Sequence, residues 1–177
     1  DFTPGTFDIL YENTRNSPRR KLWNCGPEVD MRVNTTLAKQ IAEWVIIYSP
    51  VQMASDLIEN YEGHPAFRFF RDFDADCDWS KALQGEIGDY IVVARRAKDR
   101  YFLGAGTDEK ARTLVQKLDF LEPGVTYTAT IYADAPDAGR NPEAYLIGKR
   151  AVTARDTIRI EMAERGGQAI TFIPAEK

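Results

Sequence analysis

The period of the hydrophobic pattern changes near residue 74 of this 177-residue chain. Before that point the apolar residues recur at helical spacing, and after it they alternate with polar residues. A period of 3.6 residues predicts a helix with a buried face, whereas a period of two predicts strands with one buried and one exposed face. We therefore expect two structural regions of different class, residues 1–73 and residues 74–177.

The first region contains one strong helical pattern, NTTLAKQIAEWVIIY, over residues 34–48. Five apolar residues fall on one face of that helix: Leu37, Ile41, Trp44, Val45 and Tyr48. Asn34 or Thr35 can cap its first turn, because a side-chain oxygen there accepts a bond from a free backbone N–H. Pro50 ends it, since proline has no N–H and disfavours helical geometry in the residue before it.

The stretch SPVQMASD, residues 49–56, follows directly and predicts a short strand that ends on Asp56. A helix followed by an apolar strand that ends on a carboxylate is typical of a (β/α)8 barrel, where functional side chains lie at the carboxyl ends of the strands. Alternatively, Asp56 caps a helix formed by LIENYE, residues 57–62. One such unit cannot close a barrel, so we expect residues 1–73 to be the C-terminal end of a larger catalytic barrel.

The second region predicts an antiparallel β-sandwich, because many short alternating segments are separated by turn residues. The expected strands lie in residues 89–97, 100–107, 111–120, 124–134, 144–154, 157–163 and 168–174. Glu122-Pro123-Gly124 and Arg165-Gly166-Gly167 have the composition of tight turns. The expected core residues of the sandwich are Val125, Tyr127, Ile131, Ile158, Ile160 and Phe172.

Charge and apolar content argue against two classes of partner. The net charge is −4 and the basic residues are scattered, which is unlike the basic surface of a nucleic-acid-binding protein. A membrane-spanning helix needs about 18 consecutive apolar residues, and the sequence has no such run. We therefore expect neither nucleic acid nor membrane as a partner.

Few residues offer metal or nucleophilic chemistry. His64 is the one histidine, and Cys25 and Cys77 belong to no Cys-x-x-Cys pair, which argues against a zinc site. Whether Cys25 and Cys77 form a disulfide is left open by the sequence. We expect no metal site within this segment.

Two further groups of side chains have both a functional and a structural interpretation. Asp74, Asp76 and Asp78 resemble the start of a calcium loop, but the glycine and glutamate of an EF-hand do not follow, which favours a solvated linker. The second group comprises the aromatic residues Trp79, Tyr90, Tyr101 and Phe102. They could stack on a sugar, although aromatic residues at strand spacing are more often part of a core.

Several stretches, taken in order, resemble the C-terminal part of glycoside hydrolase family 97. They are DFTPGTFD, RVNTTLAKQIAEWVIIYSPVQMASDLIENYE, the long stretch from GEIGDY to TIYAD, and GGQAITF. The α-glucosidase branch of the family is the most similar. The resemblance implies a (β/α)8 catalytic barrel followed by a β-sandwich associated with oligomerisation. It also implies a calcium-dependent, exo-acting hydrolase in the periplasm of, or secreted by, a polysaccharide-degrading bacterium.

The resemblance also implies where the site residues belong. The catalytic glutamates and calcium ligands of the family lie upstream of the segment like DFTPG, so no catalytic residue and no bound calcium is expected in this segment. Asp1 and Asp56 map to strand ends of the barrel and are candidates for the rim of the substrate site. The stretch NSPRRKLWNCGPEVDM, residues 16–31, is longer than the family pattern.

Two functions follow from the sequence. The first is a fragment of an α-glucosidase-like enzyme, inactive alone, whose partners are the upstream barrel, an α-linked oligosaccharide in the parent enzyme and a second copy in a homo-oligomer. The second is a self-standing carbohydrate-binding or oligomerisation module. The apolar helix at 34–48 favours the fragment, because a module does not need a helix with so much surface to bury.

Overall fold

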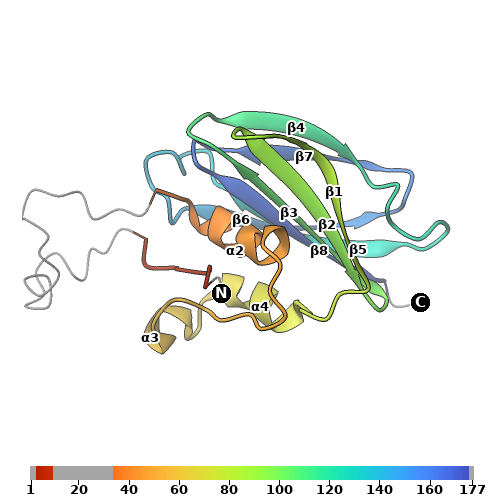
Figure 1. Ribbon diagram of the computed structural model, residues 1–177, viewed down its shortest axis with the longest axis horizontal. Helices are drawn as coiled ribbons and strands as arrows, with labels where there is room; N and C mark the ends of the chain where they lie inside the picture. Colours follow the sequence, from red (N-terminus) through yellow and green to blue (C-terminus); the bar gives the residue numbers. More distant parts are fainter. Residues whose placement is uncertain (1–2, 10–33, 176–177) are drawn as a thin grey trace, which may run out of the picture.

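Two antiparallel sheets make up most of the computed structural model, which describes residues 3–9 and 34–175 (Figure 1). Six strands form the larger sheet in the order β1-β2-β3-β8-β5-β6. Their bounds are β1 Trp79–Glu86, β2 Tyr90–Ala97, β3 Arg100–Thr107, β8 Gly167–Pro174, β5 Tyr127–Asp134 and β6 Tyr145–Val152. The smaller sheet pairs β4 Arg112–Lys117 with β7 Thr157–Met162.

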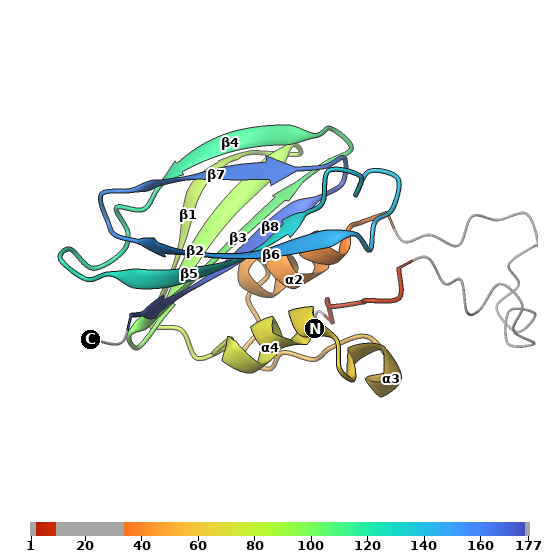
Figure 2. The ribbon, with the colours of Figure 1, turned by 180° about the vertical axis from the view of Figure 1, so that it is seen from behind.

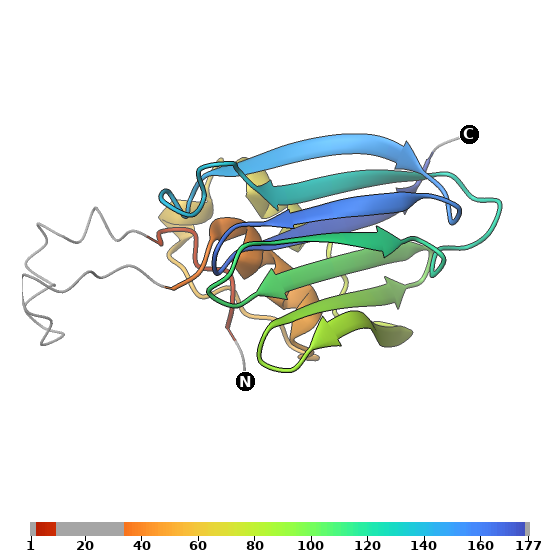
Figure 3. The same ribbon diagram turned by 90° about the horizontal axis from the view of Figure 1, so that it is seen from above.

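The six-stranded sheet is covered on both faces (Figure 2). Helix α2, Leu37–Ile46, packs on one face, and the β4–β7 pair packs on the other. Alternate residues of β3 therefore enter different cores: Phe102 lies in the helix-side core, and Leu103 lies in the core beneath β4 and β7. Viewed from above, β6 and β1 form the two edges of the sheet (Figure 3).

The seven strands predicted from the sequence are all present. Of the predicted core residues, Tyr127, Ile158, Ile160 and Phe172 are buried, while Val125 and Ile131 are partly buried against the same core. The sequence analysis missed β1, because this edge strand is mostly exposed and its register shifts between Ala82 and Gln84, which obscures any alternation.

The predicted helix is present, with corrected ends. Thr36 caps α2 by accepting a 3.2 Å bond from the backbone N–H of Lys39, so the prediction of Asn34 or Thr35 was wrong. The Thr35 hydroxyl accepts a bond from the Gln40 amide instead. The helix ends at Ile46, ahead of Pro50, so the proline is not the residue that ends it.

The strand predicted over residues 49–56 is not formed. A strand needs a neighbour to bond with, and no neighbouring strand lies beside this segment in the described residues. Its apolar side chains point outward instead, with Val51 67% and Met53 48% exposed. The barrel end therefore remains a hypothesis, as does the domain boundary near residue 74. Short helices follow the segment: α3 Ile58–Tyr61, the 3-10 turn η2 Pro65–Phe67 and α4 Arg68–Asp72.

Glycines let α2 lie directly against the sheet. A Cβ atom on Gly104 of β3 would lie 2.5 Å from the carbonyl oxygen of Ala42 and 2.8 Å from the Cβ of Val45. A Cβ atom on Gly167 of β8 would lie 2.6 Å from the Cα of Lys39. Distances this short leave no room for a methyl group, so the helix position depends on these two glycines.

Replacing Gly104 with alanine tests this dependence. We expect Gly104→Ala to lower the free energy of unfolding by about 1–3 kcal/mol, because the added methyl group has to displace the backbone of α2. Urea unfolding followed by tryptophan fluorescence measures the change. Gly139→Ala, in the loop between β5 and β6, is the control, since nothing lies within 4 Å of its added Cβ. Equal effects of the two substitutions would contradict the tight contact.

Candidate functional site

A polar clamp holds residues 3–9 against α2 and the segment from 49 to 61. Gln40 of α2 is buried, and its side-chain oxygen accepts bonds from the backbone N–H of Gly5 at 2.9 Å and of Thr6 at 3.1 Å. Trp44 donates to the carbonyl oxygen of Pro4 at 2.9 Å, and the Tyr61 hydroxyl donates to that of Gly5 at 2.7 Å. Burial raises the pKa of Tyr61 to about 12, so this hydroxyl keeps its proton at neutral pH.

Asp56 lies at the centre of the clamp, and both of its carboxylate oxygens are occupied. Oδ2 accepts the backbone N–H of Phe7 at 2.7 Å and of Asp8 at 2.8 Å. Oδ1 accepts the backbone N–H of Leu57 at 2.8 Å and the side-chain amide of Asn60 at 2.7 Å. Burial works to raise the pKa of Asp56, but these four hydrogen bonds outweigh it and the net shift is downward.

Of the two rim candidates, Asp1 and Asp56, the structure describes Asp56 alone. Asp1 lies outside the described residues. Asp56 lies beside residues 7 and 8, at the end of a segment that forms no strand. The capping alternative was wrong: Leu57 is the N-cap of α3, no side chain caps that helix, and Asp56 accepts the backbone N–H of Leu57 ahead of it. Contact of Asp56 with substrate stays a prediction. Gln40 and Tyr61 were missed, although a glutamine on an apolar helix face is a signal of a buried polar contact.

The remaining candidates have structural contacts. His64 accepts the backbone N–H of Ala66 at 3.3 Å and stacks on Tyr145, and burial lowers the pKa of its imidazole. Asp74 pairs with Lys98 at 3.1 Å, while Asp78 accepts the backbone N–H of Lys98 at 2.9 Å. Both carboxylates therefore stabilise the β2–β3 turn.

Two of the four candidate sugar-stacking residues belong to the cores. Tyr101 and Phe102 are buried, and Trp79 packs against Tyr101. Cys77 donates to the carbonyl oxygen of Asp74 at 3.3 Å, whereas Cys25 lies outside the described residues. Within residues 3–9 and 34–175, no three His, Cys, Asp or Glu side chains gather in a metal-binding group.

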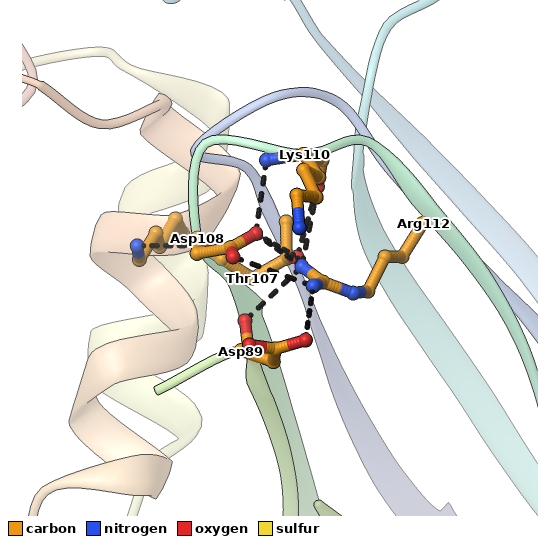
Figure 4. A network of polar contacts seen from close by, with 6 residues as sticks. Asp89, Thr107, Asp108, Lys110 and Arg112 are labelled. Carbon is orange, nitrogen blue, oxygen red and sulfur yellow. Dashed lines mark hydrogen bonds and ion pairs between the residues drawn. The ribbon is translucent and has the colours of Figure 1, made fainter. Parts of the chain in front are cut away.

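A network of charged side chains joins the β1–β2 turn to the loop after β3 (Figure 4). The Arg112 guanidinium pairs with Asp89 at 2.9 Å and with Asp108, and it also contacts the Thr107 hydroxyl. Lys39 of α2 donates to the carbonyl oxygen of Thr107 at 2.9 Å. The Arg112 contact, joined by a bond from the backbone N–H of Lys110, lowers the pKa of Asp108 to about 2.

This network borders a groove of about 730 Å³ between α2 and the β1–β2 hairpin. Glu43 lines the groove, and burial raises the pKa of its carboxyl group despite the nearby Lys39. Ile46 and Ile91 add an apolar wall. Glycoside hydrolysis needs two carboxyl groups facing each other across a sugar. Of the groove's acids, Asp89 and Asp108 pair with Arg112, and Glu43 accepts a bond from the Gln40 side-chain amide at 3.0 Å. None of the helices in the described part of the chain has the length and apolar content to cross a membrane.

Asp56 is open to a direct test of its structural role. We expect Asp56→Ala to lower the free energy of unfolding by about 1–3 kcal/mol, because three backbone N–H groups lose their acceptor. Asp56→Asn keeps one acceptor oxygen and has a smaller effect. Urea unfolding of both variants measures this, and an unchanged stability of Asp56→Ala would contradict the clamp.

Contact of Asp56 with substrate is a separate prediction. A fall in kcat/KM of the folded parent enzyme on Asp56→Asn would support that contact, and an unchanged value would contradict it.

Asp108 predicts a pH dependence of stability. Its pKa is lowered from 3.8 to about 2 in the folded state, so its contribution is complete above the ordinary value. That contribution is lost as the pH falls from about 4 to about 2. We expect Asp108→Asn to flatten this part of the melting-temperature profile, whereas Asp99→Asn, an acid with no such network, serves as the control. If the melting temperatures of Asp108→Asn and of the unmodified chain fall equally as the pH is lowered, the assignment is refuted.

Relatives of known structure match almost the whole chain. A family 97 glycoside hydrolase from Pseudoalteromonas sp. strain K8, solved in complex with acarbose, is 42% identical over 99% of this chain and 26% of its own, with a TM-score of 0.87. A β-arabinopyranosidase shares the fold at 21% identity and a TM-score of 0.65, over 84% of this chain and 23% of its own.

A curated relative agrees with these structures. A retaining alpha-galactosidase from Bacteroides thetaiotaomicron is 29% identical over 94% of this chain and 25% of its own length. The chain thus spans about a quarter of the length of the relatives it matches. The family model described as glycosyl-hydrolase 97 C-terminal, oligomerisation, matches residues 76–173, more than half of the chain. The chain therefore belongs to glycoside hydrolase family 97 and corresponds to the C-terminal part of its members.

Proposed function

We propose that this chain is the C-terminal part of an exo-acting hydrolase of α-linked glucosides. The observation that carries the proposal is the 42% identity over 99% of the chain to the Pseudoalteromonas family 97 enzyme, structures of which contain acarbose and panose. Panose consists of α-linked glucose units. The alpha-galactosidase relative is less similar, at 29% identity, which favours the glucoside over the galactoside.

Within that enzyme, the clamp supports a role for residues 3–9 and 49–61 as the end of the catalytic barrel. The two segments are distant in sequence, yet Asp56, Gln40 and Tyr61 fix their backbones side by side. Next to the clamp lies a run of exposed apolar side chains: Tyr48, Val51, Met53, Leu57 and Ile58. Exposed apolar residues this close together are typical of a contact surface, and we assign this one to the upstream barrel.

The chemistry of the parent enzyme belongs to its upstream part under this proposal. The family resemblance supports a calcium-dependent parent enzyme whose calcium ligands lie upstream of this segment. This segment then contributes the barrel end and the accessory sandwich. The family resemblance also underlies the proposals of a periplasmic or secreted location and of a homo-oligomer.

A comparison of the parent enzyme with the isolated chain tests the proposal. We expect the parent to hydrolyse an aryl α-glucoside faster than the matched α-galactoside and to lose activity when calcium is chelated. The isolated 177-residue chain should show no hydrolysis, because the reaction needs a pair of carboxyl groups that this segment does not supply. Glucose release by the purified chain would overturn this assignment, and a preference for the galactoside would overturn the specificity.

A self-standing oligomerisation module is the second candidate, favoured by the description of the matching family model. The upstream coding sequence separates the two candidates. Barrel strands and glutamates in that sequence would establish the enzyme, whereas an unrelated upstream sequence would leave the module.

A further inference from the structure

The outer edge of β6 has no neighbouring strand among the described residues. All side chains from Leu146 to Ala151 are exposed, and two large apolar ones are among them, Leu146 at 55% and Ile147 at 41%. An edge strand of this length offers a row of free backbone N–H and C=O groups to another strand. Lys149 and Arg150 are the charged residues of the edge.

The opposite edge of the larger sheet is blunted. The register of β1 shifts between Ala82 and Gln84, and such an irregularity turns an edge strand away from a partner. The Gln84 amide donates to the carbonyl oxygen of Val115 at 3.3 Å and to the side chain of Gln116 at 2.9 Å, which links β1 to β4. The sandwich is thus closed on the β1 side and open on the β6 side.

Gly148 lies in the middle of β6, where a Cβ atom would meet nothing within 4 Å. Glycine weakens a strand interior, and where it occurs it often marks the close approach of another backbone. The symmetry of an antiparallel pair adds a constraint: two identical strands in one continuous sheet are related by a two-fold axis that passes midway between one residue and its own copy.

We propose that β6 pairs antiparallel with β6 of a second copy of this chain, about a two-fold axis that lies midway between the two facing Gly148 residues. In this register Ile147 lies opposite Lys149 of the second copy, and Leu146 lies opposite Arg150. Each apolar side chain can then cover the methylene stem of a cation, and no like charges lie directly opposite. A register in which Lys149 faces Lys149 of the second copy would instead place two ammonium groups face to face. The result is one twelve-stranded sheet across two chains.

A second copy is the occupant because the family model that matches residues 76–173, which include β6, is described as glycosyl-hydrolase 97 C-terminal, oligomerisation. The inference thus rests on the homo-oligomer of the proposed function and adds the surface that forms it. Eight residues on each side are fewer than the roughly 20–30 of a standard interface, so this pairing alone gives a weak, concentration-dependent dimer. The two Lys149 ammonium groups, one from each copy, are diagonal neighbours across the pair and repel each other. Added salt screens this repulsion and should therefore strengthen the dimer.

The first experiment measures dimerisation of the full 177-residue chain by sedimentation equilibrium over a wide concentration range. We expect Ile147→Lys to raise the dimer dissociation constant about tenfold or more, because it adds a charge opposite Lys149. Val115→Lys is the matched control, since Val115 is an exposed apolar strand residue of β4. Ile147→Ser is a milder second variant, and circular dichroism establishes that each variant is folded.

The second experiment tests the register by disulfide cross-linking. In a chain with Cys25→Ser and Cys77→Ser, Gly148→Cys places two thiols on facing residues, whose Cα atoms are about 4.5–5.5 Å apart in an antiparallel pair. Leu146→Cys places them four residues out of register. We expect mild oxidation to link the Gly148→Cys chains and not the Leu146→Cys chains.

A monomer at every concentration, or a dissociation constant unchanged by Ile147→Lys, would overturn the inference. Cross-linking through residue 146 in place of 148 would overturn the register. These outcomes are independent of the hydrolase assignment. If the parent enzyme cleaves glucosides while its C-terminal part stays monomeric, only the β6 pairing is refuted. A β6 dimer in a parent without hydrolase activity refutes only the proposed function.

Discussion

Helix α2 approaches the six-stranded sheet almost backbone to backbone, and the rest of the architecture depends on that contact. It is possible because β3 and β8 present glycines to the helix, and because the helix presents Ala38 and Ala42 to the sheet. With α2 on one face and β4 and β7 on the other, the central strands are buried on both sides. Such strands lose their alternating pattern, which is why β3 is apolar or small along most of its length.

The position of α2 in turn fixes the clamp. Gln40 and Trp44 extend from the side of the helix away from the sheet and bind the backbone of residues 4–6. Asp56 and Tyr61 then bind the next residues of the same segment. Backbone groups in an irregular segment need polar partners, and here side chains supply them in place of a strand ladder. Two irregular segments are thereby held in one arrangement next to the sandwich.

Much of the sandwich was predictable from the sequence, and the reasons are local. Strands such as Thr157–Met162 alternate clearly because one face of β7 is exposed to solvent. The predicted turn Glu122-Pro123-Gly124 carries a glycine where a positive φ is needed, with Gly124 at 84°. The edge strand β1 escaped prediction because neither face of it is deeply buried. The strand expected over residues 49–56 has the right pattern, but pattern alone supplies no partner strand.

The candidate site was harder to predict, because its contacts join residues far apart in the chain. Asp56 was identified from its position after an apolar stretch, yet the groups that bind it come from residues 7 and 8. The pairing of Arg112 with Asp89 likewise depends on how two loops meet. Asp134, a partly buried carboxylate that accepts the backbone N–H groups of Ala163 and Gly167, gave no signal in the sequence, because its neighbours are fixed by the sheet order.

The strand order also bears on how the molecule is made. Strand β8 lies between β3 and β5, although it follows all the other described strands in the sequence. During synthesis, the β1–β3 meander and the β5–β6 hairpin emerge first and cannot join, because the strand that bridges them is still inside the ribosome. Until residues 167–174 appear, both inner edges remain unpaired and α2 has only half of its platform. The nascent chain therefore passes through a stage with two open sheet edges, the stage at which chaperone binding would matter most.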